Sequence, residues 1–155
     1  AQFSHPQFLQ SLERALIDTR APASCLELEI TESMAMNDPE MLIKTLHHIK
    51  QLGVQISIDD FGTGYSNLRQ LQLMPFNELK IDKGFIRNCE TDKESESIVR
   101  SSIELGQRLA IRTVAEGVET RELAERLRRM LDSPIELHGL FIQVEDLLLT
   151  AQLQL

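Results

Sequence analysis

The sequence predicts an α/β fold built around a mainly parallel sheet. Segments with the two-residue period of a strand alternate along the chain with segments that have the period of a helix. Each predicted strand also has one apolar and one polar side, whereas strands covered by helices on both faces are almost continuously apolar. A closed barrel accounts for both observations, because helices cover its outer face and polar side chains can line its upper lumen.

The first half of the chain predicts two helices and two strands. A capping box at Ser4–Gln7, with a proline inside it, begins a helix whose apolar residues recur every four positions. Residues 26–30 alternate between apolar and acidic side chains, which is the period of a strand. A second helix begins at Asp38 and ends at Gly53. The strand period then returns over residues 54–59.

The same alternation continues in the second half. The predicted segments are a helix at 66–74, a strand at 79–82, a helix at about 94–109, a strand at 111–116 and a helix at 120–130. The leucine-rich segment 142–155 has no period that assigns it to a helix or a strand. We expect one domain over residues 1–155, because this length is enough for a single core.

The composition excludes several classes of function. The net charge of -8 argues against polymeric nucleic acid as a partner, because nucleic acids are held by clustered Lys and Arg. No apolar run approaches the roughly 20 residues of a membrane span, and the N-terminus has no signal-peptide pattern. Cys25 and Cys89 lack metal-ligand spacing, so we interpret them as buried free thiols of a reducing compartment. We therefore expect a cytoplasmic protein without a membrane segment.

The segment Ile56–Ser66 contains several candidates for metal-binding or catalytic residues. It reads as a strand that ends in two adjacent carboxylates, Asp59 and Asp60, followed by a turn with two glycines. Like charges this close raise each other's pKa, and a metal ion would remove that cost. The alternative is a pair of turn-forming aspartates that lead into a helix. Taken alone, the segment leaves both interpretations open.

The polar sides of the other strands favour a site. In a barrel, the carboxyl ends of parallel strands meet at one rim, where active sites lie. Four strands would each bring an ionisable residue to this rim: Glu29, Asp59, Lys80 and Glu116. Lys80 by itself could be a surface lysine or a Schiff-base lysine of an aldolase. The neighbouring acids suit metal ions better than aldolase chemistry.

Four segments resemble successive motifs of the EAL domain family, a TIM-like barrel that hydrolyses cyclic di-GMP to the linear dinucleotide pGpG. They are Leu28–Ser33, Ile58–Ser66, Leu79–Asp82 and Val114–Thr120. Their order and spacing fit the family over residues 2–120, and the fit is weak over residues 121–155. The resemblance implies an incomplete barrel of about six βα units that lacks the first two strands of the family barrel.

The resemblance also implies a metal-dependent mechanism. Three carboxylates would be metal ligands: Glu29, Asp59 and Asp60. Lys80 would orient the nucleophilic water and the phosphate, and Glu116 would be a metal ligand or the general base. The implied cofactors are two Mg²⁺ or Mn²⁺ ions, which favour carboxylate oxygens. Two such ions can clamp the attacking and leaving oxygens of a phosphodiester.

Three further residues receive supporting roles from the resemblance. Glu32 would hold the loop from Asp60 to Ser66, which in the family also couples the site to a dimer interface. Thr63 would support this loop or the substrate. Glu119 would support the substrate or a second metal. The implied partners are cyclic di-GMP and a second copy of the chain.

The sequence departs from the family in one important respect. The family binds metal with a Glu on its first strand and an Asn on the next, and the 155 residues contain neither motif. A site that lacks two ligands should hold its metals poorly. We therefore expect little or no hydrolysis by this chain, although its family function is that of a phosphodiesterase. The alternative is a degenerate EAL-like module that binds cyclic di-GMP or a protein partner without hydrolysis.

Overall fold

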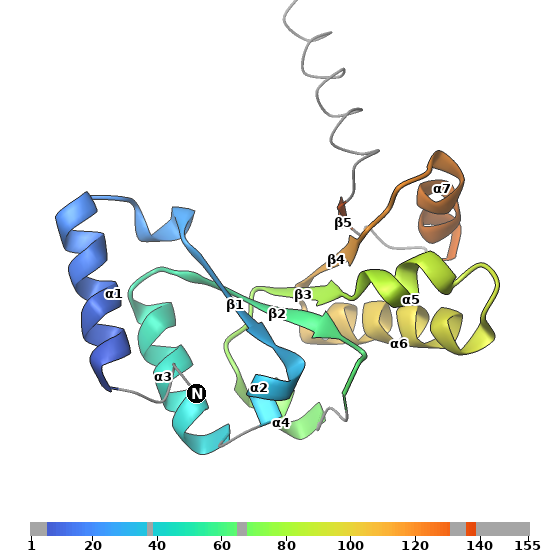
Figure 1. The fold of residues 1–155 in the computed structure, drawn as a ribbon. Helices are drawn as coiled ribbons and strands as arrows, with labels where there is room; N and C mark the ends of the chain where they lie inside the picture. Colours follow the sequence, from blue (N-terminus) through green and yellow to red (C-terminus); the bar gives the residue numbers. More distant parts are fainter. Residues whose placement is uncertain (1–5, 37–38, 65–67, 131–135, 139–155) are drawn as a thin grey trace, which may run out of the picture.

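Parallel strands form the centre of the fold (Figure 1). The structure is a computed structural model that describes residues 6–36, 39–64, 68–130 and 136–138. Within these residues the strands are β1 (Glu27–Thr31), β2 (Gln55–Phe61), β3 (Glu78–Ile81), β4 (Arg112–Glu116) and β5 (Glu136–His138). The helices are α1 (Pro6–Thr19), α2 (Glu32–Met36), α3 (Pro39–Gln51), α4 (Leu68–Leu73), α5 (Lys83–Asn88), α6 (Lys93–Leu109) and α7 (Arg121–Met130), with a 3-10 turn η2 at Ala23–Cys25.

The strand order identifies the type of α/β fold. The sheet runs β1-β2-β3-β4-β5 in chain order, and each neighbouring pair is parallel. Right-handed crossovers between strands in sequential order place the connecting helices on one face of the sheet. The other face is left for a lumen, so the predicted incomplete barrel is confirmed. The described residues contain five strands, one fewer than the expected number of about six units, and segment 139–155 lies outside them.

The predicted elements are present, with ends that differ by a few residues from the prediction. Two helices were not predicted, α2 and α5. They have five and six residues, which is too short for the helical period to show in a sequence. The side chain of Asp82 caps α5 by accepting a hydrogen bond from the Gly84 N–H at 2.8 Å.

The core lies between the apolar sides of the strands and the helices. Its fully buried side chains include Ile30, Ile56, Ile58, Leu79 and Ile81 from the strands and Leu46, Ile49, Ile103 and Leu127 from the helices. Burying one such side chain contributes about 1.5–3 kcal/mol. The predicted alternation of apolar and polar sides is therefore the pattern that packs this core. In the described residues, no helix is both long enough and apolar enough to cross a membrane.

Two predictions fail at the start of β1. Leu26 was expected to face the core, but 39% of its surface is exposed. Cys25 was expected to be buried and is exposed, whereas Cys89 is buried as expected. The physical reason is that η2 ends at Cys25, so both residues precede the part of the strand that the helices cover.

Helix α6 approaches strand β4 closely because several residues on its inner face have small side chains or none. Its buried residues include Ser95, Ser102 and Gly106. A Cβ atom added at Gly106 would lie 2.0 Å from the Thr113 Oγ1 atom of β4, which is far inside van der Waals contact. The close contact between α6 and β4 therefore requires glycine at this position.

Replacing this glycine tests the contact. Gly106→Ala is expected to lower the free energy of unfolding by about 1–3 kcal/mol, the usual cost of overpacking. Alanine is the better helix former by about 1 kcal/mol, so an effect of helix propensity alone would have the opposite sign. Urea denaturation followed by circular dichroism measures the change. Gln107→Ala, at an exposed position of the same helix, is the control.

A second substitution separates the clash from other causes. Thr113→Ala removes the Oγ1 atom that the new methyl group would meet. The double variant Gly106→Ala/Thr113→Ala should therefore lose less stability than the two single changes added together. Strict additivity would contradict the proposed contact.

Candidate active site at the carboxyl ends of the strands

The structure brings the predicted rim residues together. In the parallel register, Glu29 lies beside Ser57 and Thr31 lies beside Asp59. The Lys80 ammonium donates a hydrogen bond to the Glu29 carboxylate, which joins β3 to β1 across β2. Glu116 ends β4, close enough to feel the charges of Asp59, Lys80 and Glu29. Four strands thus contribute to one cluster of charged groups.

A β-bulge places both aspartates at this end of β2. Ile58 pairs with Leu79 and Phe61 pairs with Ile81, so two residues of β2 lie opposite the single residue Lys80. Asp60 is in the left-handed region with a φ of +55°, which adjacent strand residues do not normally adopt. Its N–H donates to the Asp59 Oδ1 atom at 2.9 Å. The extra residue explains how neighbouring acids can serve one site although side chains alternate along a regular strand.

Burial, together with the charge of nearby acids, raises the pKa of two acids of the cluster, Glu116 and Asp60. Burial raises the pKa of Glu116, and the charge of Asp59 adds to this effect, while Lys80 opposes it. Burial also raises the pKa of Asp60, with further contributions from Asp59 and Asp82. Burial lowers the pKa of Lys80, but its hydrogen bond to Glu29 and nearby acids outweigh this, and its pKa is raised overall. The cluster has more negative charge than one lysine neutralises.

The donor groups suit a hard divalent cation. Carboxylate oxygens are the ligands that Mg²⁺ and Mn²⁺ prefer, and a cation would relieve the repulsion that raises these pKa values. However, no group of three or more His, Cys, Asp or Glu side chains in the described residues is arranged to hold a metal ion. The chemistry of the site therefore fits a metal, and the assignment of Glu29, Asp59 and Asp60 as its ligands stays a prediction.

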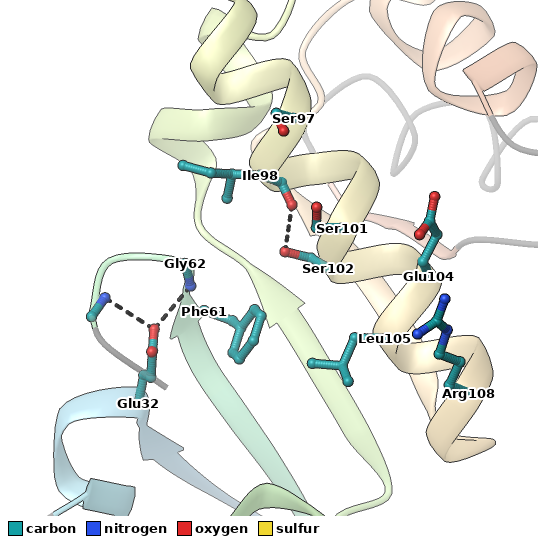
Figure 2. A pocket seen from close by; sticks show the side chains of 11 residues that line it. Glu32, Phe61, Gly62, Ser97, Ile98, Ser101, Ser102, Glu104, Leu105 and Arg108 are labelled. Atoms are coloured by element: carbon teal, nitrogen blue, oxygen red, sulfur yellow. Dashed lines mark hydrogen bonds between the residues drawn. The ribbon is translucent and has the colours of Figure 1, made fainter. Parts of the chain in front are cut away.

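Glu32 anchors the loop that follows β2. Its carboxylate is 1% exposed and accepts hydrogen bonds from the Gly62 N–H at 2.9 Å and the Gly64 N–H at 3.1 Å (Figure 2). Thr63 is exposed, and its hydroxyl donates to the Asp60 carbonyl oxygen at 2.9 Å. The predicted loop support by Glu32 and Thr63 thus has a structural basis in backbone hydrogen bonds.

A pocket of about 450 Å³ lies between this loop and α6 (Figure 2). Phe61, Gly62 and Glu32 form one wall, and Ser97, Ser101 and Leu105 of α6 are among the residues of the other wall. The pocket is distinct from the charged cluster, whose residues do not line it. It is therefore a candidate contact surface rather than the site of chemistry.

The loop after β4 lies against α5. Glu119, expected to support substrate or metal, forms an ion pair with Arg87 of α5. Gly117 has a φ of +71°, and a Cβ atom there would lie 2.8 Å from the Lys83 Cβ atom. Sequence reasoning did not identify Arg87 or Lys83, because the helix that carries them was not predicted. The Asp82-Lys83-Gly84 sequence, a capping residue before a short helix, was the available signal.

The EAL domain model matches residues 1–133. The chain belongs to the EAL domain family. Its relatives include the bifunctional diguanylate cyclase/cyclic di-GMP phosphodiesterase MucR of Pseudomonas aeruginosa, 44% identical over 129 residues. The cyclic di-GMP phosphodiesterase NbdA of the same species is 38% identical over 120 residues.

Solved EAL structures agree with the fold. The MucR phosphodiesterase in complex with cyclic di-GMP superimposes with a TM-score of 0.83 at 43% identity, covering 89% of this chain and 55% of that one. A manganese and cyclic di-GMP complex of Klebsiella pneumoniae BlrP1 gives a TM-score of 0.76 at 28% identity, covering 90% of this chain and 35% of that one. The chain spans only 19% of the length of MucR and 15% of the length of NbdA.

The anchoring role of Glu32 predicts a stability effect. Glu32→Ala leaves the Gly62 and Gly64 N–H groups without this acceptor. Gly62 is half-buried and Gly64 is exposed, so water can replace part of the lost bonding, and the cost is at or below the about 1–3 kcal/mol of a buried unsatisfied group. We expect a lower free energy of unfolding and faster amide hydrogen exchange at Gly62 and Gly64. Both N–H groups donate to the same oxygen of Glu32, Oε2. Glu32→Gln keeps one such acceptor oxygen but loses the charge, and it should be intermediate. Unchanged exchange at both glycines in Glu32→Ala would contradict the anchor.

The raised pKa of Glu116 predicts that Glu116→Gln changes the pH dependence of folding stability when a chelator removes metal ions. Because the folded state binds this proton more tightly than the unfolded state, stability decreases as pH rises from the unfolded pKa through the folded pKa. Glu116→Gln removes this loss. The variant should therefore be more stable than the parent at about pH 7 and equal to it at about pH 3, below the ordinary Glu pKa.

Urea midpoints across this pH range, with EDTA present, provide the measurement. Glu122→Gln, an exposed carboxylate on α7, is the matched control and should not change the pH profile. A Glu116→Gln variant that is less stable than the parent at neutral pH would show that the ionised carboxylate is favourable in the folded state.

Proposed function

We propose that this EAL domain belongs to a metal-dependent phosphodiesterase that hydrolyses cyclic di-GMP to linear pGpG. The observation that carries the proposal is the convergence of Glu29, Asp59, Lys80 and Glu116 at the carboxyl ends of four neighbouring strands. Its support from relatives is that MucR and NbdA are named as enzymes of this class. A cytoplasmic location, where a nucleotide messenger would be met, is part of the same proposal.

The residues of the rim divide the chemistry among them. Glu29, Asp59 and Asp60 would hold the Mg²⁺ or Mn²⁺ ions. When bound, such ions lower the pKa of water and neutralise the charge of the phosphodiester. Lys80, whose ammonium is held by Glu29, orients the phosphate and the attacking water. Glu116 accepts the proton of that water, since a carboxyl with a raised pKa is a better general base near neutral pH.

The loops complete this assignment. Glu32 and Thr63 fix the backbone after Asp60 through the hydrogen bonds described above. Glu119 follows Glu116 by three residues and pairs with Arg87 of α5. From this position Glu119 supports the substrate or a second metal once that pair is exchanged.

We propose further that the 155-residue chain alone is a poor catalyst. Three carboxylate ligands and Glu116 remain, but the Glu and Asn that the family resemblance adds are absent from these residues. Fewer ligands mean weaker metal binding. Cyclic di-GMP binding without hydrolysis, as in a degenerate EAL module, is the second candidate function.

Hydrolysis and binding distinguish the two functions. With Mn²⁺ and cyclic di-GMP, the 155-residue chain should form no more linear product than its Asp59→Asn variant. A longer form of the protein that carries both further ligands should form product, and Asp59→Asn should abolish it. Asp18→Asn, at an exposed position of α1, is the matched control. Product from the short chain that disappears in Asp59→Asn would contradict its proposed inactivity.

Titration of the same ligand then separates binding from a scaffold role. Isothermal calorimetry with Ca²⁺ in place of Mn²⁺ measures affinity for cyclic di-GMP. We expect binding by the longer form that is lost in Asp59→Asn. A longer form that binds the ligand but never cleaves it would support the degenerate module instead.

We also propose that two copies of the chain associate through the pocket beside α6. The α6 wall of this pocket contains serines, Ile98 and Leu105, and it carries two residues of opposite charge, Glu104 and Arg108, one turn apart (Figure 2). A two-fold axis would place Glu104 of one copy near Arg108 of the other. Because Glu32 lines the same pocket, dimer formation would act on the loop after Asp60.

Charge reversal tests this dimer. Arg108→Glu should weaken association at least about tenfold, because it brings like charges together. Glu104→Arg/Arg108→Glu restores complementary pairs and should restore association. Sedimentation velocity provides the measurement, with Arg128→Glu at an exposed position of α7 as control. A parent chain that sediments as a single monomeric species at all concentrations would contradict the dimer.

A further inference from the structure

Ser57 is a buried polar residue that the proposed chemistry does not use. It lies in the middle of β2, and its exposed fraction is 0%. Its hydroxyl oxygen has no hydrogen-bond partner within the described part of the chain. Burying a hydroxyl without a partner costs about 1–3 kcal/mol by mutational data, and native proteins contain few such groups. The serine therefore needs a partner that is not another described side chain.

The neighbours of Ser57 identify the chemistry of that partner. In the register of the sheet, Glu29 lies beside Ser57 on one side and Glu78 lies beside it on the other. All three side chains point to the same face, because residues in register on neighbouring strands share a face. A serine hydroxyl between two carboxylates has one proton to donate. A direct bond could therefore satisfy only one of the two acids.

We infer that a structural water molecule is bound between Ser57, Glu78 and Glu29. The Ser57 hydroxyl donates to the water oxygen, and the two water protons are donated to the two carboxylates. The Ser57 Oγ atom makes no direct hydrogen bond to either carboxylate within the described residues. One bridging water can join polar groups that are not in direct hydrogen-bond contact.

The surroundings are polar, as a bound water requires, and they are buried on the side of Ser57 and Glu78, while the Glu29 side chain is 52% exposed. The Glu78 side chain is 8% exposed and forms an ion pair with Arg112 at 3.0 Å. The Lys80 side chain is 12% exposed and bonds to Glu29 from the same face. The water would thus lie beneath the Lys80–Glu29 pair, in contact with two residues that this pair and Arg112 already hold in place.

The position gives Ser57 a role in the site. Glu29 receives Lys80 on one side, and the water would fix its carboxylate from below. Ser57 is then a positioning residue for the Lys80–Glu29 pair. This inference concerns a water site and is independent of the proposed hydrolysis.

A crystal structure that resolves ordered waters tests the inference directly. We expect a water within hydrogen-bond distance of the Ser57 Oγ atom and of at least one carboxylate oxygen of Glu78 or Glu29. In Ser57→Ala this water should be lost and the Glu29 side chain should adopt more than one rotamer. A direct hydrogen bond from Ser57 to a protein group, with no water, would overturn the inference.

The sign of the stability change in Ser57→Ala gives an independent test. If the hydroxyl is part of a water-bridged network, its removal leaves that network incomplete, and the urea midpoint falls. If the hydroxyl has no partner, its removal relieves a desolvation cost, and the midpoint rises, which would overturn the inference. Thr45→Val is the control, because the buried Thr45 hydroxyl bonds to the Met41 carbonyl oxygen of its own helix.

Discussion

Repulsion among the acids at one edge of the sheet is the constraint on which the site depends. Strand ends in a parallel sheet converge, so acids on several strands must come together. The burial of Glu116 and Asp60 makes this costly, as their raised pKa values show. Lys80 offsets part of the cost by bonding to Glu29 across the intervening strand. The remaining negative charge makes the rim suited to cations.

The local backbone is shaped to maintain this arrangement. The bulge in β2 and the left-handed Asp60 place two aspartates opposite one lysine. Glu32, buried beneath the next turn, then fixes the chain with two backbone hydrogen bonds. A buried acceptor of this kind holds its loop strongly, because losing it leaves amide groups unsatisfied. The position of the acids thus depends on the Glu32 hydrogen bonds to the following loop as well as on Lys80.

The short helix α5 connects the two loops of the site. Its Phe85 side chain is within 3.0 Å of the position that a Cβ atom would take at Gly62, after β2. Its Arg87 side chain pairs with Glu119 after β4. The contact between Phe85 and Gly62 is closely packed. The Arg87–Glu119 pair is half exposed, with an exposed fraction of 50% for the Arg87 side chain. Exposed ion pairs contribute little to stability, so the loop after β4 is the less firmly held of the two.

The sequence by itself determined the order of helices and strands and the sides of the strands that form the core. Both follow from hydrophobic periodicity, which is a local property of the sequence in strands and in helices of normal length. It also determined which four strands carry ionisable residues at their ends, and its motifs resembled the family to which the chain belongs. These features depend on residues close together in sequence.

The tertiary structure alone decided how those residues meet. The bulge at Asp59 and Asp60 depends on pairing with β3, about 20 residues later in the chain. The Lys80–Glu29 bond, the Arg87–Glu119 pair and the row of Glu29, Ser57 and Glu78 join separate strands and loops. The exposure of Cys25 and Leu26 likewise depends on where the covering helices end. Such features arise from contacts between distant segments, and no local period encodes them.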